Sequence, residues 1–130
     1  AGADTAEVKK LFQNDLEGTI AKYAIIQNAK LYREKIAIAV VDHTVGRIVA
    51  AQAADELLNI IGIDTSFVLY PDGERVIISA RSMGDTNVQV ILEKLGGGGN
   101  AAAAGGQISG KSLSQVATEL SHAIDQYLEG

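Results

Sequence analysis

The other segments of the chain are arranged around one stretch of small residues, Leu95-Gly96-Gly97-Gly98-Gly99-Asn100-Ala101-Ala102-Ala103-Ala104-Gly105-Gly106. It contains four consecutive glycines, one amide side chain and otherwise only alanine and glycine after the leucine. Glycine loses more backbone entropy on folding than other residues, so such a run is expected where backbone approaches a neighbour closely or points N–H groups at an anion. Composition leaves two interpretations open: a loop that holds a phosphate-bearing ligand, and a flexible linker between two helices.

The composition predicts one domain with an aliphatic core. The 130 residues suit a single core, and 47% are hydrophobic but only 5% aromatic, so Ala, Val, Ile and Leu must fill the interior. Cysteine is absent, which excludes disulfides and thiol chemistry. No apolar run has membrane-spanning length. The net charge of −5 argues against general binding of DNA or RNA, whereas a small nucleotide held by a few local donors is compatible with it.

The N-terminal segment is predicted to be helical. Asp4 and Glu7 have the spacing of a capping box, and apolar residues follow at helical intervals from Val8 onward. Gly18 interrupts this pattern, which resumes over residues 19–27. We expect two helical pieces or one bent helix, which lies across the domain or connects it to another.

Two strands and a helix are expected next. A short strand is predicted at Ala29–Tyr32, and residues 33–35 have the composition of a turn. Residues 36–41 (Ile-Ala-Ile-Ala-Val-Val) are a continuous apolar run, which is typical of a strand buried on both faces. A helix is expected over Gly46–Ile61, because apolar residues and alanines follow its turns as far as Gly62, which ends it.

The second half of the chain predicts a hairpin, a short helix, a strand and a final helix. Pro71-Asp72-Gly73 has the residues of a tight turn between two β-branched segments. Ser112 and Gln115 form a capping box before the most regular amphipathic pattern in the sequence. The expected elements are strands Thr65–Tyr70 and Arg75–Ala80, a helix at Asn87–Leu95, an edge strand at Gln107–Ser109 and a helix from Ser112. This order indicates a single α+β domain with a small mixed β-sheet covered by helices.

Several motifs that carry chemistry elsewhere have simpler explanations here. Gly105-x-x-x-x-Gly110-Lys111-Ser112 matches the Walker A pattern, but no buried strand precedes it, so Ser112 is better explained as a helix N-cap. Asp42-His43 lacks the further ligands that a metal site needs. The paired acids Asp55 and Glu56 are most simply solvated on a helix surface. Without Cys or a nucleophile elbow, the residues indicate a binding domain rather than a self-contained enzyme.

Arg81 is the candidate partner of the glycine stretch. It stands in Ser79-Ala80-Arg81-Ser82 at the end of a predicted strand, and residues 83–86 then lead to the helix that runs into the glycines. An arginine at a strand end can present its planar fork to a phosphate. The alternative, a surface arginine paired with Asp85, is held open on equal terms. If the helix doubles back, Arg81 and the glycine stretch face one cleft.

These segments resemble a known family. Ser79-Ala80-Arg81-Ser82 and Asn87-Val88-Gln89-Val90-Ile91-Leu92-Glu93-Lys94-Leu95-Gly96-Gly97-Gly98-Gly99 are similar to the C-terminal DHH-associated domain of the DHH phosphoesterases. The helix at Ala50–Asp55 and the strand at Ser66–Leu69 resemble those of the membrane-anchored cyclic di-AMP phosphodiesterases of Gram-positive bacteria (GdpP-like). The likeness runs from about Asp4 to the C-terminus.

The resemblance implies a binding role within a hydrolase. In this family a preceding DHH domain holds Mn²⁺ through Asp and His ligands and hydrolyses a phosphodiester, while the C-terminal domain closes the cleft and grips the nucleotide. By resemblance, the substrate-binding residues would be Arg81, Gly96, Gly97, Gly98, Gly99 and Asn100. No catalytic residue, metal ligand or cofactor is expected in this domain itself, and Mn²⁺ is expected in the DHH domain.

Asn100 departs from the family pattern. The family loop usually reads Gly-Gly-Gly-His, and Asn100 stands where the histidine would be. Asparagine donates and accepts hydrogen bonds but carries no titrating proton or positive charge. Either this member binds substrate mainly through backbone N–H groups and Arg81, or its activity is weaker or altered.

The resemblance also sets expectations for the whole protein. Residues 4–130 are expected to form the substrate-binding domain, with residues 4–30 as its helical connector and the catalytic DHH domain outside this chain. The expected partners are a cyclic dinucleotide or short oligonucleotide, the upstream DHH domain and a second copy of the chain, with no membrane contact from this segment. A cytoplasmic location is expected, with any membrane anchor in a segment outside this chain. The alternative is a structural or dimerisation module in which the glycine stretch is a packing device.

Overall fold

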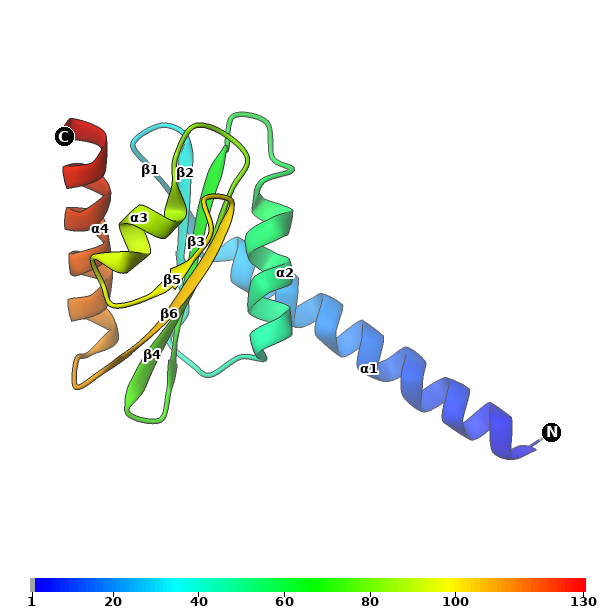
Figure 1. The fold of residues 1–130 in the computed structure, drawn as a ribbon. Coiled ribbons are helices and arrows are strands. Elements are labelled where there is room, and N and C mark those ends of the chain that lie inside the picture. Colours follow the sequence, from blue (N-terminus) through cyan, green and yellow to red (C-terminus); the bar gives the residue numbers. More distant parts are fainter. Residues whose placement is uncertain (1) are drawn as a thin grey trace.

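The computed structural model describes residues 2–130, with side chains from residue 5 onward. Helices alternate with pairs of strands along this part of the chain (Figure 1). They are α1 (Gly2–Gln27), β1 (Ala29–Tyr32), β2 (Ile36–Val40), α2 (Arg47–Leu57), β3 (Thr65–Asp72), β4 (Arg75–Ser82), α3 (Val88–Glu93), β5 (Gly98–Gly99), β6 (Ala103–Ser109) and α4 (Leu113–Glu129). The predicted α+β class is confirmed.

The described strands form a mixed sheet in the order β1-β2-β3-β4-β6-β5. β2 and β3 are parallel because the connection through α2 returns the chain to the same end of the sheet. The other neighbouring strands are antiparallel. α3 and α4 cover one face of the sheet, while α2 and the C-terminal end of α1 cover the other (Figure 1).

The two faces of the sheet supply two separate cores. On β4, Val76, Ile78 and Ala80 point toward α3 and α4, whereas Ile77 points toward α2, as the alternation of a strand requires. The fully buried alanines of α2 are Ala50, Ala53 and Ala54. Their small side chains let α2 lie close to β3 and β4. The core on the α2 side contains no described residue of β6, so the α2 face of β6 is left without a covering helix.

α1 is a single helix that passes through Gly18 without a break and extends away from the sheet (Figure 1). It begins at Gly2, so the predicted start at Asp4 is wrong, and the proposed capping box with Glu7 lies partly outside the described side chains. Ile25 is buried near its C-terminal end. The large apolar side chains that α1 leaves exposed are Val8, Leu11, Phe12, Leu16, Ile20 and Tyr23. No helix of the described chain is long and apolar enough to cross a membrane.

The predicted boundaries are confirmed where capping or turn residues mark them. β1 occupies the predicted residues, and Ser112 and Gln115 cap α4 reciprocally. The predicted hairpin exists, but its turn falls at residues 73–74, because Pro71 and Asp72, predicted as turn residues, pair with β4 as the end of β3. α2, however, ends at Leu57 rather than Ile61. The next residues form tight turns, in which Leu58 N–H donates to the Asp55 carbonyl, and Ile61 is fully exposed.

Candidate functional site

The glycine stretch is a β-hairpin that belongs to the sheet. Gly98 pairs with Gly105 and Gly99 with Ala104, so β5 and β6 are antiparallel neighbours. β6 begins at Ala103, four residues before the strand predicted at Gln107–Ser109. The interpretation of this stretch as a flexible linker between two helices is therefore wrong, because its residues are paired strands.

The first glycines of the stretch end α3. Gly96 has a φ of +86°, a left-handed conformation that glycine adopts without steric cost. Gly97 N–H donates to the Leu92 carbonyl at 2.8 Å and Gly96 N–H to the Glu93 carbonyl at 3.1 Å. These two bonds are the pattern of a Schellman C-cap, which reverses the chain toward β6.

Gly97 and Gly99 also allow close backbone packing. A Cβ on Gly97 would lie 2.4 Å from the Gly105 carbonyl oxygen. A Cβ on Gly99, which has a φ of +147°, would lie 2.4 Å from the Ala103 carbonyl oxygen. Gly98 differs from both, because a Cβ there would meet nothing within 4 Å. The glycines therefore have a structural role in the hairpin, and the space beside Gly98 is open.

Asn100 stabilises the turn between β5 and β6. Its Oδ1 accepts hydrogen bonds from the N–H groups of Ala102 at 3.0 Å and Ala103 at 2.9 Å, and its own N–H donates to the Ala103 carbonyl at 2.8 Å. The next carbonyls tether the turn to the domain. Ser82 N–H donates to Ala102 at 2.9 Å and Val88 N–H donates to Ala101 at 3.1 Å.

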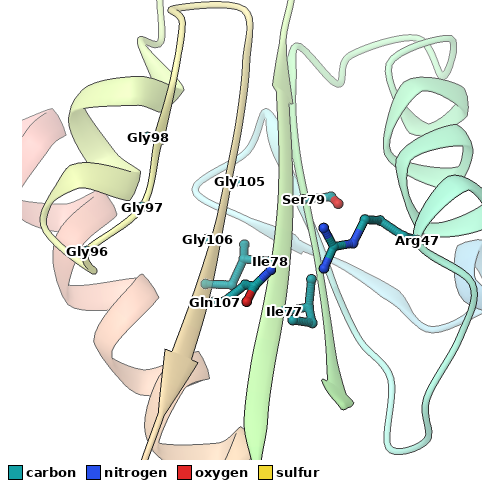
Figure 2. A pocket seen from close by; sticks show the side chains of 10 residues that line it. All are labelled: Arg47, Ile77, Ile78, Ser79, Gly96, Gly97, Gly98, Gly105, Gly106 and Gln107. Carbon is teal, nitrogen blue, oxygen red and sulfur yellow. The ribbon is translucent and has the colours of Figure 1, made fainter.

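A groove of about 440 Å³ lies between α2 and the glycine hairpin (Figure 2). Its lining residues are Arg47, Ile77, Ile78, Ser79, Gly96, Gly97, Gly98, Gly105, Gly106 and Gln107. In the register of β4 and β6, Ser79 is opposite Gly105 and Ile77 is opposite Gln107. Paired residues of neighbouring strands project from the same face, so the groove lies on the α2 face of the sheet, where β6 has no covering helix.

Arg81 lies next to the groove rather than in its lining. It is two residues beyond Ser79 on β4 and therefore on the same face of the sheet. Its Nε is 3.0 Å from Asp55 Oδ1, and its Nη1 donates to the Ala80 carbonyl at 2.9 Å. The partner is thus Asp55 and not the predicted Asp85, and the expectation that Asp55 is merely solvated is wrong.

The structure groups the predicted site residues only in part. Gly96, Gly97 and Gly98 line the groove together with Ser79, whereas Arg81, Gly99 and Asn100 do not. Sequence reasoning did not single out Arg47 or Gln107 as site residues. The signal for Arg47 was its place at the start of a helix that follows a buried strand, where N–H groups favour anions.

The described residues do not provide a manganese site. No group of three or more His, Cys, Asp or Glu among the side chains of residues 5–130 could hold a metal ion. In the pair Asp42-His43, His43 Nδ1 is 3.0 Å from Asp42 Oδ1, and both side chains are exposed. The hydrogen bond to His43 lowers the pKa of Asp42, so the pair is a local surface contact.

Comparison with known proteins identifies the family. The DHHA1 domain matches residues 33–130, which is about three quarters of the chain. The chain belongs to the DHHA1 domain family. The expected resemblance to the DHH-associated domain is therefore confirmed, and the matched residues begin after α1.

Relatives of known name are much longer than this chain. It is 42% identical to the cyclic-di-AMP phosphodiesterase GdpP of Bacillus subtilis and 38% identical to the cyclic-di-AMP phosphodiesterase PdeA of Listeria monocytogenes. Each match covers 99% of this chain but only 20% of the relative, so the chain spans about a fifth of their length. An exopolyphosphatase-related protein from Bacteroides fragilis shares the fold, with a TM-score of 0.74, 21% identity, and coverage of 85% of this chain and 34% of that chain.

Proposed function

We propose that this chain is the nucleotide-binding part of a phosphodiesterase that hydrolyses cyclic di-AMP or short oligonucleotides. The observation that carries the proposal is the identity of 42% and 38% with two cyclic-di-AMP phosphodiesterases over 99% of the chain. A DHH domain of the same protein, with Mn²⁺ as its metal, would carry out the hydrolysis. The proposed place of action is the cytoplasm, where this domain would present the substrate to the metal centre.

The shape of the groove supports a nucleotide as ligand. Its volume of about 440 Å³ lies in the range of small-molecule sites. Gly98 and Gly105 face each other in its floor without side chains, so a ligand can approach the backbone of β5 and β6. A dinucleotide bound there would extend along β4 from Ser79 toward Arg81.

Arg81 keeps a donor for such a ligand. Asp55 and the Ala80 carbonyl occupy Nε and Nη1, whereas Nη2 forms no hydrogen bond within the part of the chain whose side chains are described, residues 5–130. The ion pair with Asp55 holds the guanidinium in one orientation, which reduces the entropy that binding would cost. Arg81 and the hairpin at residues 96–100 are accordingly the proposed substrate contacts.

Calorimetric titration of the chain with cyclic di-AMP tests the proposal. We expect saturable binding, and we expect Arg81→Ala to weaken it about tenfold, because a hydrogen bond to a charged group is lost. Lys30→Ala, which removes one positive charge from the exposed strand β1 at the other edge of the sheet, is the control and should bind like the wild type. Circular dichroism checks that both variants fold. Absence of binding by the wild type, or unchanged affinity in Arg81→Ala, would contradict the proposal.

A dimerisation module is the second candidate, and the surface of α1 favours it. Six large apolar side chains of this helix are exposed, including Phe12 and Leu16. Exposed apolar surface of this kind commonly marks a contact with another protein surface. Sedimentation equilibrium should then find a dimer for the wild type and a monomer for the double variant Phe12→Gln/Leu16→Gln. A wild-type monomer at high micromolar concentration would rule this candidate out.

A further inference from the structure

We infer that Arg47 and Ser79 form a phosphate-binding subsite on the α2 side of the groove. This inference rests on the proposed function and deepens it, because it assigns one phosphate of the nucleotide to a pair of residues away from Arg81. Its basis is one unpaired cation, one buried hydroxyl without a partner and the open groove that both of them line.

Arg47 is the first residue of α2, and its side chain extends from the helix toward β4 (Figure 2). Its guanidinium forms no ion pair and no hydrogen bond with the side chains described, those of residues 5–130. The other arginines of the chain, Arg33, Arg75 and Arg81, each pair with a carboxylate. Among the described residues that line the groove, Arg47 alone is charged. A guanidinium with all its donors free is suited to bidentate binding of a phosphate.

Ser79 supplies the second donor. It is 9% exposed and lines the groove from the middle of β4, and no hydrogen bond is recorded for its hydroxyl within the described chain. No side-chain oxygen or nitrogen among these residues is both sealed from solvent and unpartnered. The Ser79 hydroxyl therefore opens into the groove. A hydroxyl that opens into the groove and has no protein partner is free to donate a hydrogen bond to a bound anion.

The start of α2 adds to the attraction for an anion. Its N-cap residue, Gly46, forms no side-chain capping bond, and the first turn of α2 contains no acidic residue. The N–H groups of the first turn and the positive end of the helix dipole are thus not neutralised by a carboxylate of this turn. Arg47 and the Ser79 hydroxyl form a positive corner of the groove, and Arg47 belongs to this first turn.

The floor of the groove determines where the rest of the ligand lies. A phosphate at Arg47 and Ser79 leaves its nucleoside over Gly98 and Gly105, where no side chain obstructs a flat ring. The space above Gly98 is open, because an added Cβ would meet nothing within 4 Å. A large side chain at this position would occupy the nucleoside space without displacing protein atoms near the backbone.

Calorimetric titration with cyclic di-AMP, applied to the wild type and to single variants of the 130-residue chain, tests the inference. We expect Arg47→Gln to weaken binding about tenfold and Ser79→Ala about threefold, from the loss of a charged and a neutral hydrogen bond. Gly98→Leu should abolish binding while thermal unfolding stays close to that of the wild type. Lys35→Gln, which makes the same change of charge in the β1–β2 turn, should leave affinity unchanged.

A second titration, with inorganic phosphate followed by NMR, separates the subsite from the proposed function. We expect shifts of the Arg47 side chain and of the Ser79 amide that are absent from Arg47→Gln. Binding of cyclic di-AMP that is unaffected by all three groove variants would overturn the subsite and leave the proposed function standing. Phosphate shifts at Arg47 and Ser79 without any binding of cyclic di-AMP would support the subsite and contradict the proposed function. Absence of both responses would overturn both.

Discussion

Gly97 and Gly98 are adjacent in the sequence, yet an added methyl group meets different surroundings at each. At Gly97 the methyl carbon would lie 2.4 Å from the Gly105 carbonyl oxygen, and at Gly98 it would lie in open space. We expect Gly97→Ala to lower the free energy of unfolding by about 1–3 kcal/mol, because β5 must move away from β6. Gly98→Ala should change it by less than about 1 kcal/mol. Urea unfolding of both variants measures the difference, and equal effects would contradict the packing role of Gly97.

At the same scale, Asn100 and Arg81 show what a sequence motif can and cannot predict. The motif correctly marked a tight glycine structure after a short helix. It did not predict that the Asn100 Oδ1 would be used by the N–H groups of Ala102 and Ala103. Nor did it predict that Asp55, 26 residues away in the sequence, would pair with Arg81. Both partners are fixed by hairpin geometry and by the packing of α2 on the sheet, which residue order alone does not reveal.

At the scale of elements, the turn between β1 and β2 is joined to α4 by a charged cluster. Tyr32 Oη donates to Asp125 Oδ1 at 2.7 Å, Arg33 Nε donates to the same oxygen at 3.1 Å, and Arg33 also pairs with Glu129. The hydrogen bond from Tyr32 lowers the pKa of Asp125, and the positive charge of Arg33 acts in the same direction. The contact links the edge strand to the last helix through one carboxylate.

This cluster predicts a loss of stability in acid. A carboxyl whose pKa is lower in the folded state stabilises the fold above its unfolded pKa of about 4, and this contribution disappears as the pH falls through the folded value. Tyr32→Phe removes the main cause of the shift, so we expect it to lose less stability than the wild type between pH 5 and 3 (roughly the window that brackets this titration). Urea unfolding at several pH values measures both slopes. Parallel slopes would show that Asp125 does not contribute.

Element existence was predictable where periodicity or capping residues are local. The hairpin of β3 and β4, the capped start of α4 and the short strand β1 all follow from neighbouring residues. The end of α2 and the strand β5 do not. Apolar residues continue past Leu57 at helical spacing, although Ile61 contacts no core, and Gly98-Gly99 has no strand propensity. β5 exists because β6 offers an edge to pair with, which is a long-range cause.

At the scale of the whole molecule, α1 divides into an exposed half and a docked half. Residues 5–17 are all exposed. In the docked half, Ile25 is buried in the core that α2 shares, and Lys22 Nζ lies 3.9 Å from Glu56 Oε2. We therefore expect deletion of residues 1–16 to leave the thermal midpoint within a few degrees of the wild-type value, because residues 5–16 bury no side chain. On this scale, a loss of about 1 kcal/mol in the free energy of unfolding lowers the midpoint by several degrees. Differential scanning calorimetry at a concentration where the chain is monomeric gives this comparison.

Ile25→Ala is the matched change in the docked half of α1. It removes a buried side chain from the core between α1, α2 and the sheet, and large-to-small changes of this kind cost about 2–5 kcal/mol. We expect a clear fall of the thermal midpoint for this variant, in contrast to the deletion. If the deletion lowered the midpoint as much as Ile25→Ala, the exposed half of α1 would have to contact the domain or another copy of it. If neither change had an effect, the sheet with α2, α3 and α4 would hold the fold without α1.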